Sequence, residues 1–157
     1  MKKSLKYVFP ILFIMSCGTD LKAQIPVNSG IQKQIEQGQF TFVANSASPL
    51  RGRTRFLDAS YDVKLGKDTV ASYLPYFGVA EQPPLSSDEA GIRFTSTKFE
   101  YSFTQRNKGG WNVQVLFKDQ SATRQFNFIV FENGNATLDV TSNFRDPISF
   151  KGDIKKE

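Results

Sequence analysis

The sequence contains no histidine, and its only cysteine, Cys17, lies among the first 24 residues. Histidine is the commonest general base, and cysteine supplies the thiol nucleophile and many zinc ligands. Beyond residue 24 the composition therefore excludes thiol chemistry, disulfides and cysteine-ligated zinc. The chain also lacks a glycine-rich phosphate loop and a Gly-x-Ser-x-Gly nucleophile motif. We expect a protein that is not an enzyme and that uses neither a cofactor nor a metal.

Carboxylates are the remaining candidates for catalysis, because a pair of them can hydrolyse glycosides. Among the 15 acidic residues, the candidates are Asp58, Asp62, Glu100 and Asp139. Most of them fall at outward positions of expected strands, where solvated surface charge is the ordinary role. A carboxylate-type hydrolase is therefore the least favoured of the functional hypotheses.

Positive charge is scarcer than the whole chain suggests. The 20 basic and 15 acidic residues give a net charge of +5. Three of the lysines lie within residues 1–16, so the remainder carries 17 basic and 15 acidic residues, a net charge of +2. This small excess is no argument for nucleic-acid binding, and we expect none.

Residues 1–23 have the pattern of an export signal, with three early lysines before a short apolar run at 7–15. The run is too short to span a bilayer as a helix. Ile14-Met15-Ser16-Cys17 resembles a lipoprotein cleavage motif, although Ile14 and Met15 depart from it; Leu21-Lys22-Ala23 is the alternative site for ordinary signal peptidase. We expect export to the periplasm or outer membrane, with membrane contact only through a lipid on Cys17.

The stretch from Phe99 to Phe117 is the clearest structural signal. Apolar and polar residues alternate on both sides of a turn at 105–110 that contains two glycines. A period of two places every second side chain on one face, as in a half-buried strand. Two such runs around a glycine-containing turn predict a β-hairpin in which Trp111 packs in the core.

Further alternating runs lie at 39–44, 61–65, 69–76, 92–95, 126–130, 136–141 and 148–154. Between them we expect a turn-rich connection at 45–50, an extended segment at 51–58, a loop at 80–91 and a type I′ turn at Asn133-Gly134. Strands about 8–12 residues apart indicate an antiparallel sandwich or curled open barrel of about eight or nine strands.

One short helix is expected within residues 25–38. Ile31 and Ile35 are four residues apart, Ser29 is a capping residue, and Gly38 is a stop signal. Residues 24–38 would then form a tether and a short helix. Residues 39–154 would form a single β domain, which suits the length of the chain.

Several runs are similar to a family of small secreted bacterial proteins known as domain of unknown function 4251. They include Tyr73-Leu74-Pro75-Tyr76-Phe77-Gly78 and lie within 50–53, 72–78, 94–96, 108–111, 133–138, 140–143 and 147–150. The resemblance covers most of residues 39–154. It implies an exported protein of the Bacteroidota envelope, and it carries over no catalytic residue, because the family has no assigned activity.

Tyr73, Tyr76 and Phe77 form the first candidate binding site. Three aromatic residues within five positions could form a surface platform for an apolar or sugar-like ligand, or for a protein partner. The alternative is that alternation sends Tyr73 and Phe77 to one face and Tyr76 to the other, with one of the faces in the core.

Arg51, Arg53 and Arg55 form the second candidate site. In an extended segment their guanidinium groups would share one side and could bind phosphate, sulfate or a carboxylated sugar. The alternative is three separate ion pairs with nearby carboxylates (Asp58, Asp62 or Glu100), each worth about 0–1 kcal/mol.

The sequence favours a non-catalytic envelope protein that binds a small ligand or another envelope protein. The second hypothesis is a structural partner of an outer-membrane assembly. A ligand binder should have a concave pocket lined by aromatic residues, whereas a structural partner should have a flat apolar patch and co-purify with a membrane complex.

Overall fold

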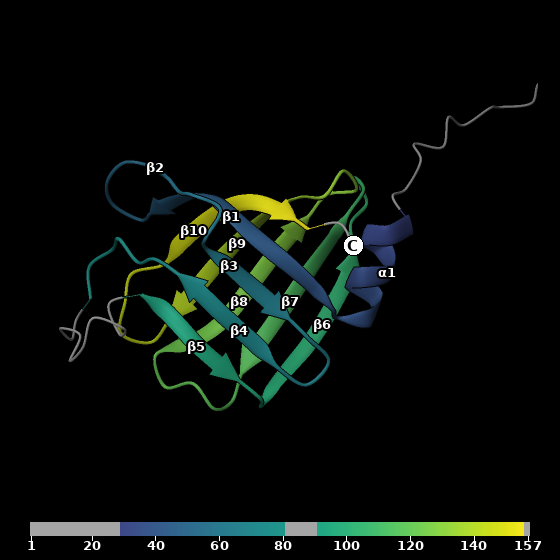
Figure 1. Cartoon of the computed structure of the whole chain (residues 1–157). Coiled ribbons are helices and arrows are strands. Elements are labelled where there is room, and N and C mark those ends of the chain that lie inside the picture. The colour runs from purple at the N-terminus through teal and green to yellow at the C-terminus, as the bar shows by residue number, and fades with distance from the viewer. Residues whose placement is uncertain (1–28, 81–90, 156–157) are drawn as a thin grey trace, which may run out of the picture.

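The computed structural model describes residues 29–80 and 91–155, which form one helix and ten strands (Figure 1). The predicted export signal and the central part of the expected loop at 80–91 lie outside the described residues. The helix is α1 (Ser29–Gln37), and the strands are β1 (Phe40–Pro49), β2 (Arg55–Phe56), β3 (Asp62–Leu65), β4 (Val70–Leu74), β5 (Ile92–Ser96), β6 (Phe99–Gln105), β7 (Trp111–Phe117), β8 (Thr123–Val130), β9 (Asn135–Ser142) and β10 (Ile148–Ile154).

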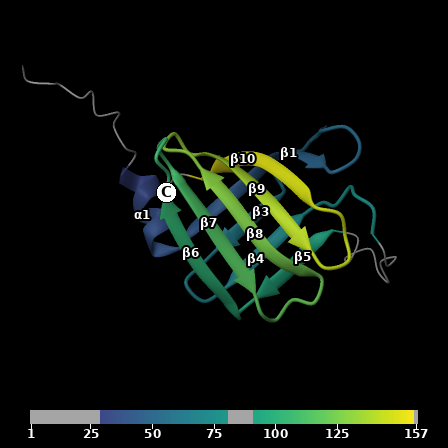
Figure 2. The ribbon, with the colours of Figure 1, turned by 180° about the vertical axis from the view of Figure 1, so that it is seen from behind.

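The strands form one antiparallel sheet that curls into a nearly closed barrel. Nine of them follow the order β5-β4-β3-β1-β10-β9-β8-β7-β6, and β2 pairs with β1 beside this path. Strands β1, β3, β4 and β5 cross in front of β6 to β9, and the view from behind shows the second layer (Figure 2). The mainly β prediction is therefore confirmed, and of the two predicted architectures, a sandwich and a curled open barrel, the structure has the barrel, which is nearly closed.

The predicted two-residue alternation explains the interior of the barrel. In β7 the side chains of Trp111, Val113 and Val115 are buried, whereas Asn112 and Gln114 between them are exposed. Strands β8 and β9 show the same alternation of buried positions. The expected hairpin from 99 to 117 forms with Phe99 opposite Phe117, and Trp111 is a core residue.

Phenylalanine rings fill the centre of the barrel. The ring of Phe128 lies 5.5 Å from that of Phe40, 5.7 Å from Phe42 and 6.2 Å from Phe126, each time edge to face. This is the arrangement that the ring quadrupoles favour. Phe40 and Phe128, which are 88 positions apart in the chain, therefore meet in one cluster, which joins the two layers of the barrel.

Helix α1 packs against one end of the barrel. Ile31 and Ile35 are buried in the same core as the strands, as their spacing predicts. The hydroxyl of Tyr101 on β6 donates to the carbonyl of Ile35 at 2.6 Å, and burial raises the pKa of Tyr101. Gln34 donates to the carbonyl of Lys155 at 3.2 Å, so α1 also fixes the end of β10.

The expectation of a turn-rich connection at 45–50 was wrong, because β1 continues to Pro49. A bulge between Ala44 and Ser46 places Asn45 outside the regular pairing, where its amide donates to Asp153 at 2.7 Å. Beyond the bulge, β1 still pairs with β10. Polar residues read as a turn are thus tolerated in a strand whose neighbour supplies the backbone hydrogen bonds.

Two other local expectations also need correction. Within 51–58 only Arg55 and Phe56 are strand, because a bend at 50–52 interrupts the extended run. The turn at Asn133-Gly134 is not type I′, which needs positive φ at both central residues. Only Gly134 has a positive φ, at 97°, and its N–H donates to the Phe131 carbonyl at 2.9 Å.

The corner between β5 and β6 joins the two ends of the sheet. These strands are consecutive in the chain, yet they are the unpaired ends of the strand order. The Asp119 carboxylate accepts hydrogen bonds there from the Ser96 hydroxyl at 2.5 Å and from the N–H groups of Thr97 and Lys98 at 3.0 and 3.2 Å. These bonds, the Ser96 hydroxyl first, lower the pKa of Asp119 to about 2.

The first prediction concerns the ring cluster. Phe128→Ala removes a ring that is 1% exposed, so we expect the free energy of unfolding to fall by about 3–5 kcal/mol. Phe103→Ala is the matched control, because Phe103 is 40% exposed and should cost much less. Urea denaturation of both variants provides the measurement, and equal losses would contradict the assignment of Phe128 to the centre of the core.

The second prediction concerns pH. The pKa of Asp119 is lowered from 3.8, so its carboxylate stabilises the fold above about pH 4, and this contribution disappears as the pH falls through about 2. Asp119→Asn should lower the melting temperature at pH 7, and the gap from wild type should close between pH 4 and pH 2. Thermal melts across this range test it; a gap that stays constant would show that the charge at Asp119 is irrelevant.

Candidate functional site

The β1–β2 hairpin (residues 46–56) projects from the barrel at the end opposite α1 (Figure 1). Ser46 pairs with Phe56 and Ala47 with Arg55, while the hydroxyls of Ser48 and Thr54 are joined by a hydrogen bond of 2.9 Å. The hairpin therefore has a paired base and a bent tip. It presents the predicted arginine site to solvent on a defined backbone.

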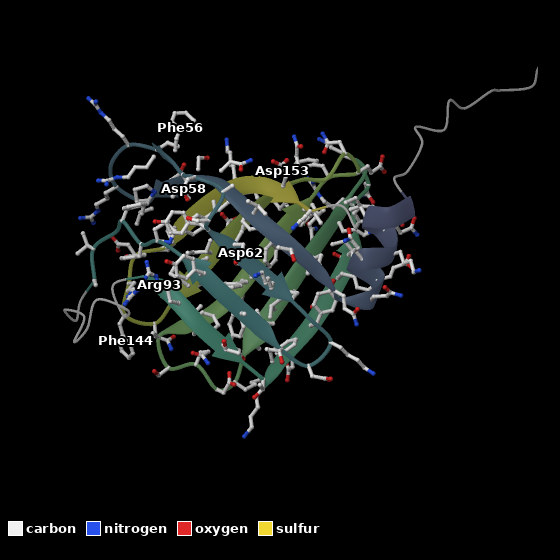
Figure 3. All side chains as sticks on the ribbon, in the orientation of Figure 1. Phe56, Asp58, Asp62, Arg93, Phe144 and Asp153 are labelled. Atoms are coloured by element: carbon white, nitrogen blue, oxygen red, sulfur yellow. The ribbon has the colours of Figure 1, made fainter. Side chains whose placement is uncertain are left out.

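Two large apolar side chains of this hairpin are exposed. Phe56 is 92% exposed and Leu50 is 62% exposed, although both belong to residue types that are usually buried. Val79 and Phe144 are exposed elsewhere on the same end of the molecule, and Figure 3 shows Phe56 and Phe144 along that side. Phe103 and Phe131 are as exposed as Phe144, so the feature that indicates an interaction surface is the exposure of Phe56 and Leu50 together on one hairpin.

The three predicted arginines are all exposed on this hairpin, but they do not form a straight row. Arg51 lies within the bend at 50–52 and Arg53 follows it, whereas Arg55 lies in β2. The guanidinium carbon of Arg55 lies 4.5 Å from the centre of the Phe77 ring. The structure thus joins one residue from each predicted site, a contact that the sequence analysis did not anticipate.

The expected ion pairs of these arginines are not made among the described residues. Asp62 pairs with Lys64 at 3.4 Å, and Glu100 pairs with Lys118 at 3.2 Å. Hydrogen bonds from Ser60, the hydroxyl first and then the N–H, lower the pKa of Asp58. The carboxylates named as candidate partners therefore have other neighbours, and no described carboxylate forms an ion pair with Arg51 or Arg53.

The structure separates the three predicted aromatic residues. Tyr73 is exposed on the outer face of β4, stacked at 5.7 Å on Tyr61 and with the Arg93 guanidinium 4.5 Å from its ring centre. Leu74 is buried at the end of the strand. Phe77 is half-buried and packs against the core. The predicted surface platform therefore does not form as one unit.

Tyr76 connects two segments at this end of the barrel. Its hydroxyl lies 2.8 Å from the Val79 carbonyl and 3.1 Å from the Asp146 carbonyl, and it donates to this pair. The Arg145 guanidinium lies 5.1 Å from the Tyr76 ring centre. Burial raises the pKa of Tyr76. The N–H of Asp146 also donates to the Val79 carbonyl at 3.1 Å, so the segments after β4 and β9 form a fixed support beside the hairpin.

Hollows on the described surface lie on outer faces of the sheet. One of about 370 Å³ lies over β6 to β9, and its lining combines hydroxyl and amide side chains, such as Asn112 and Gln114, with apolar ones, such as Phe103 and Ile129. Another, of about 310 Å³, lies over β3 to β5 beside Tyr73. The interior itself is filled by phenylalanine rings, and each hollow also has aromatic residues in its lining, Phe103 in the first and Tyr73 and Phe94 in the second.

The described residues offer no grouping that could hold a metal ion: no three carboxylate, cysteine or histidine side chains gather there. Asp139, the last candidate carboxylate, accepts a hydrogen bond from Ser149 on the neighbouring strand. No helix in the described part of the chain is long and apolar enough to cross a bilayer. Cys17, the predicted lipidation site, lies outside the described residues.

Sequence reasoning missed Leu50 and Phe56, the most exposed apolar residues of the hairpin. A signal was present, since both flank the Arg-x-Arg-x-Arg run and neither belongs to a regular alternating segment. It also missed Arg145, which follows a turn and donates to the Gly91 carbonyl at 2.8 Å. Nothing in the spacing of Tyr76 and Arg145, 69 residues apart, predicts their contact.

The third prediction concerns the close approach of Tyr76 to Gly78. A Cβ atom on Gly78 would lie 2.3 Å from the Tyr76 hydroxyl oxygen, so Gly78→Ala must displace that ring. We expect a loss of about 1–3 kcal/mol in the free energy of unfolding. In a Tyr76→Ala background the same change should cost much less, because the clash is gone. Denaturation of the single and double variants forms the cycle, and additive losses would refute this account.

Comparison with known proteins identifies the fold and the family. A family model described as a domain of unknown function (DUF4251) matches residues 27–154. The structure is similar to the crystal structure of a DUF4251 family protein from Bacteroides eggerthii, with a TM-score of 0.60. The sequence identity is 15%, and the match covers 83% of this chain and 87% of that chain, which shows a shared fold. No curated protein matches the chain. Since the family model spans the helix and every strand of the barrel, this chain belongs to the DUF4251 family.

Proposed function

We propose that this protein is a non-catalytic, exported binding module of the cell envelope, and that the β1–β2 hairpin is its contact surface. The observation that carries the binding role is the exposure of Phe56, at 92%, beside three exposed arginines on one projecting hairpin. Export is supported by the basic and apolar pattern of residues 1–23, with Cys17 or Ala23 at the point of cleavage.

The contacts around the hairpin support this role. The hairpin base is paired with β1, and Arg55 is held over Phe77, which itself packs against the core. A partner that meets this surface would therefore find part of it already ordered, which lowers the entropy cost of binding. The position of the hairpin also fits, because α1, which follows the proposed tether, lies at the other end of the barrel.

The fourth prediction tests the contact surface in cells. We expect the Leu50→Ser/Phe56→Ser variant of the full chain to recover its crosslinked envelope partner at least about tenfold less than wild type, because buried aromatic anchors dominate interfaces. Phe103→Ser at the other end of the barrel is the matched control. Quantitative mass spectrometry of crosslinked envelopes gives the readout, with melting temperatures to confirm that both variants fold.

Two outcomes would change the proposal. Equal recovery by wild type and the hairpin variant would place the contact surface elsewhere. Recovery of the chain within a stable membrane complex, insensitive to soluble ligands, would favour the alternative function as a structural partner of an outer-membrane assembly.

A further inference from the structure

We propose that the β1–β2 hairpin recognises an acidic polysaccharide, through its arginines and the exposed ring of Phe56. This inference rests on the proposed binding role and names the chemical class of the ligand. Acidic sugars combine carboxylate groups with ring faces made of C–H groups. The hairpin presents the complementary pair of groups within a single loop.

The charge of the hairpin selects an anion. Arg51 lies in the bend and Arg53 directly after it, both exposed, and no described carboxylate forms an ion pair with either. Arg55 lies with its guanidinium over Phe77. A guanidinium stacked on a ring still presents N–H groups at its edge, in the plane that suits a carboxylate. Three cations on one loop would repel a second copy of the same hairpin.

The placement of Phe56 favours a sugar over a bilayer. Phe56 lies at the base of the hairpin, paired with Ser46, while the tip carries Arg51 and Arg53. A loop that enters a bilayer leads with its apolar side chains and keeps its cations at the headgroups behind them. Here the tip carries Arg51 and Arg53 beside a single large exposed apolar side chain, Leu50, and the more exposed ring of Phe56 lies behind them at the base. A chain of acidic sugars lying along the hairpin would meet arginine at the tip and the Phe56 ring at the base.

The fifth prediction measures binding of four probes to the purified full chain: polygalacturonate, neutral dextran, poly-L-glutamate and phosphatidylglycerol vesicles. We expect polygalacturonate to bind most tightly, with affinity that falls as salt is added. Arg51→Ala/Arg53→Ala should weaken this binding at least about tenfold. Lys33→Ala/Lys108→Ala removes the same charge from exposed sites elsewhere and is the matched control.

Phe56→Ala separates sugar recognition from simple charge attraction. It should weaken binding of polygalacturonate while leaving any binding of poly-L-glutamate unchanged, since only the sugar stacks on the ring. Equal affinity for the polypeptide, for dextran or for vesicles would overturn the assignment in favour of an acidic protein, a neutral glycan or a lipid surface. Failure of polygalacturonate to bind would also overturn the sugar proposal. The broader binding role would still be supported if the hairpin variant had lost its crosslinked partner.

Discussion

The corner between β5 and β6 is the constraint on which this barrel depends. The two strands are the ends of the sheet and do not pair, so backbone hydrogen bonds cannot close the ring there. Side-chain contacts hold the two ends of the sheet together instead. The Phe94 and Phe117 rings meet edge to face at 5.0 Å across the two layers, and Asp119 binds the backbone of the corner. Helix α1 then packs against β6 through Tyr101.

In this nearly closed barrel a connected cluster of phenylalanine rings fills the interior. Phe117, Phe126 and Phe128 contact one another in sequence, and Phe128 continues the cluster to Phe40 and Phe42. Such a filled interior leaves the outer surface and the projecting loops to carry recognition. That division explains why the informative residues are those few apolar side chains that stand outside the core, Phe56 above all.

The hairpin follows from how β1 changes partner. On one edge β1 pairs with β10 along its length, but on the other edge it pairs first with β3 and, after the bulge at Asn45, with β2. Strand β2 thus pairs with the part of the β1 edge that β3 does not reach. Because only two residues pair, the rest of the loop is free to extend beyond the barrel and expose its arginines.

The contacts within the candidate site could not be predicted from the sequence. The arginine spacing and the aromatic run each predict a surface, but nothing in the sequence predicts that the two meet. Contact between Arg55 and Phe77 depends on two loops meeting at the end of the barrel, and the contact of Arg145 with Tyr76 joins segments even further apart. The export signal and Cys17 remain predictions from the sequence alone.

The alternation of apolar and polar residues by itself determined most of the strands, the buried faces of β7 to β9 and the antiparallel sheet, because side-chain direction in a strand depends only on position along the chain. The period of residues 111–117 was enough to place Trp111 in the core. Tertiary structure alone decided that the sheet closes at Asp119, that β1 continues through a bulge, and that Phe56 stands in solvent. These features depend on which distant strands lie beside one another, and local periodicity carries no information about that.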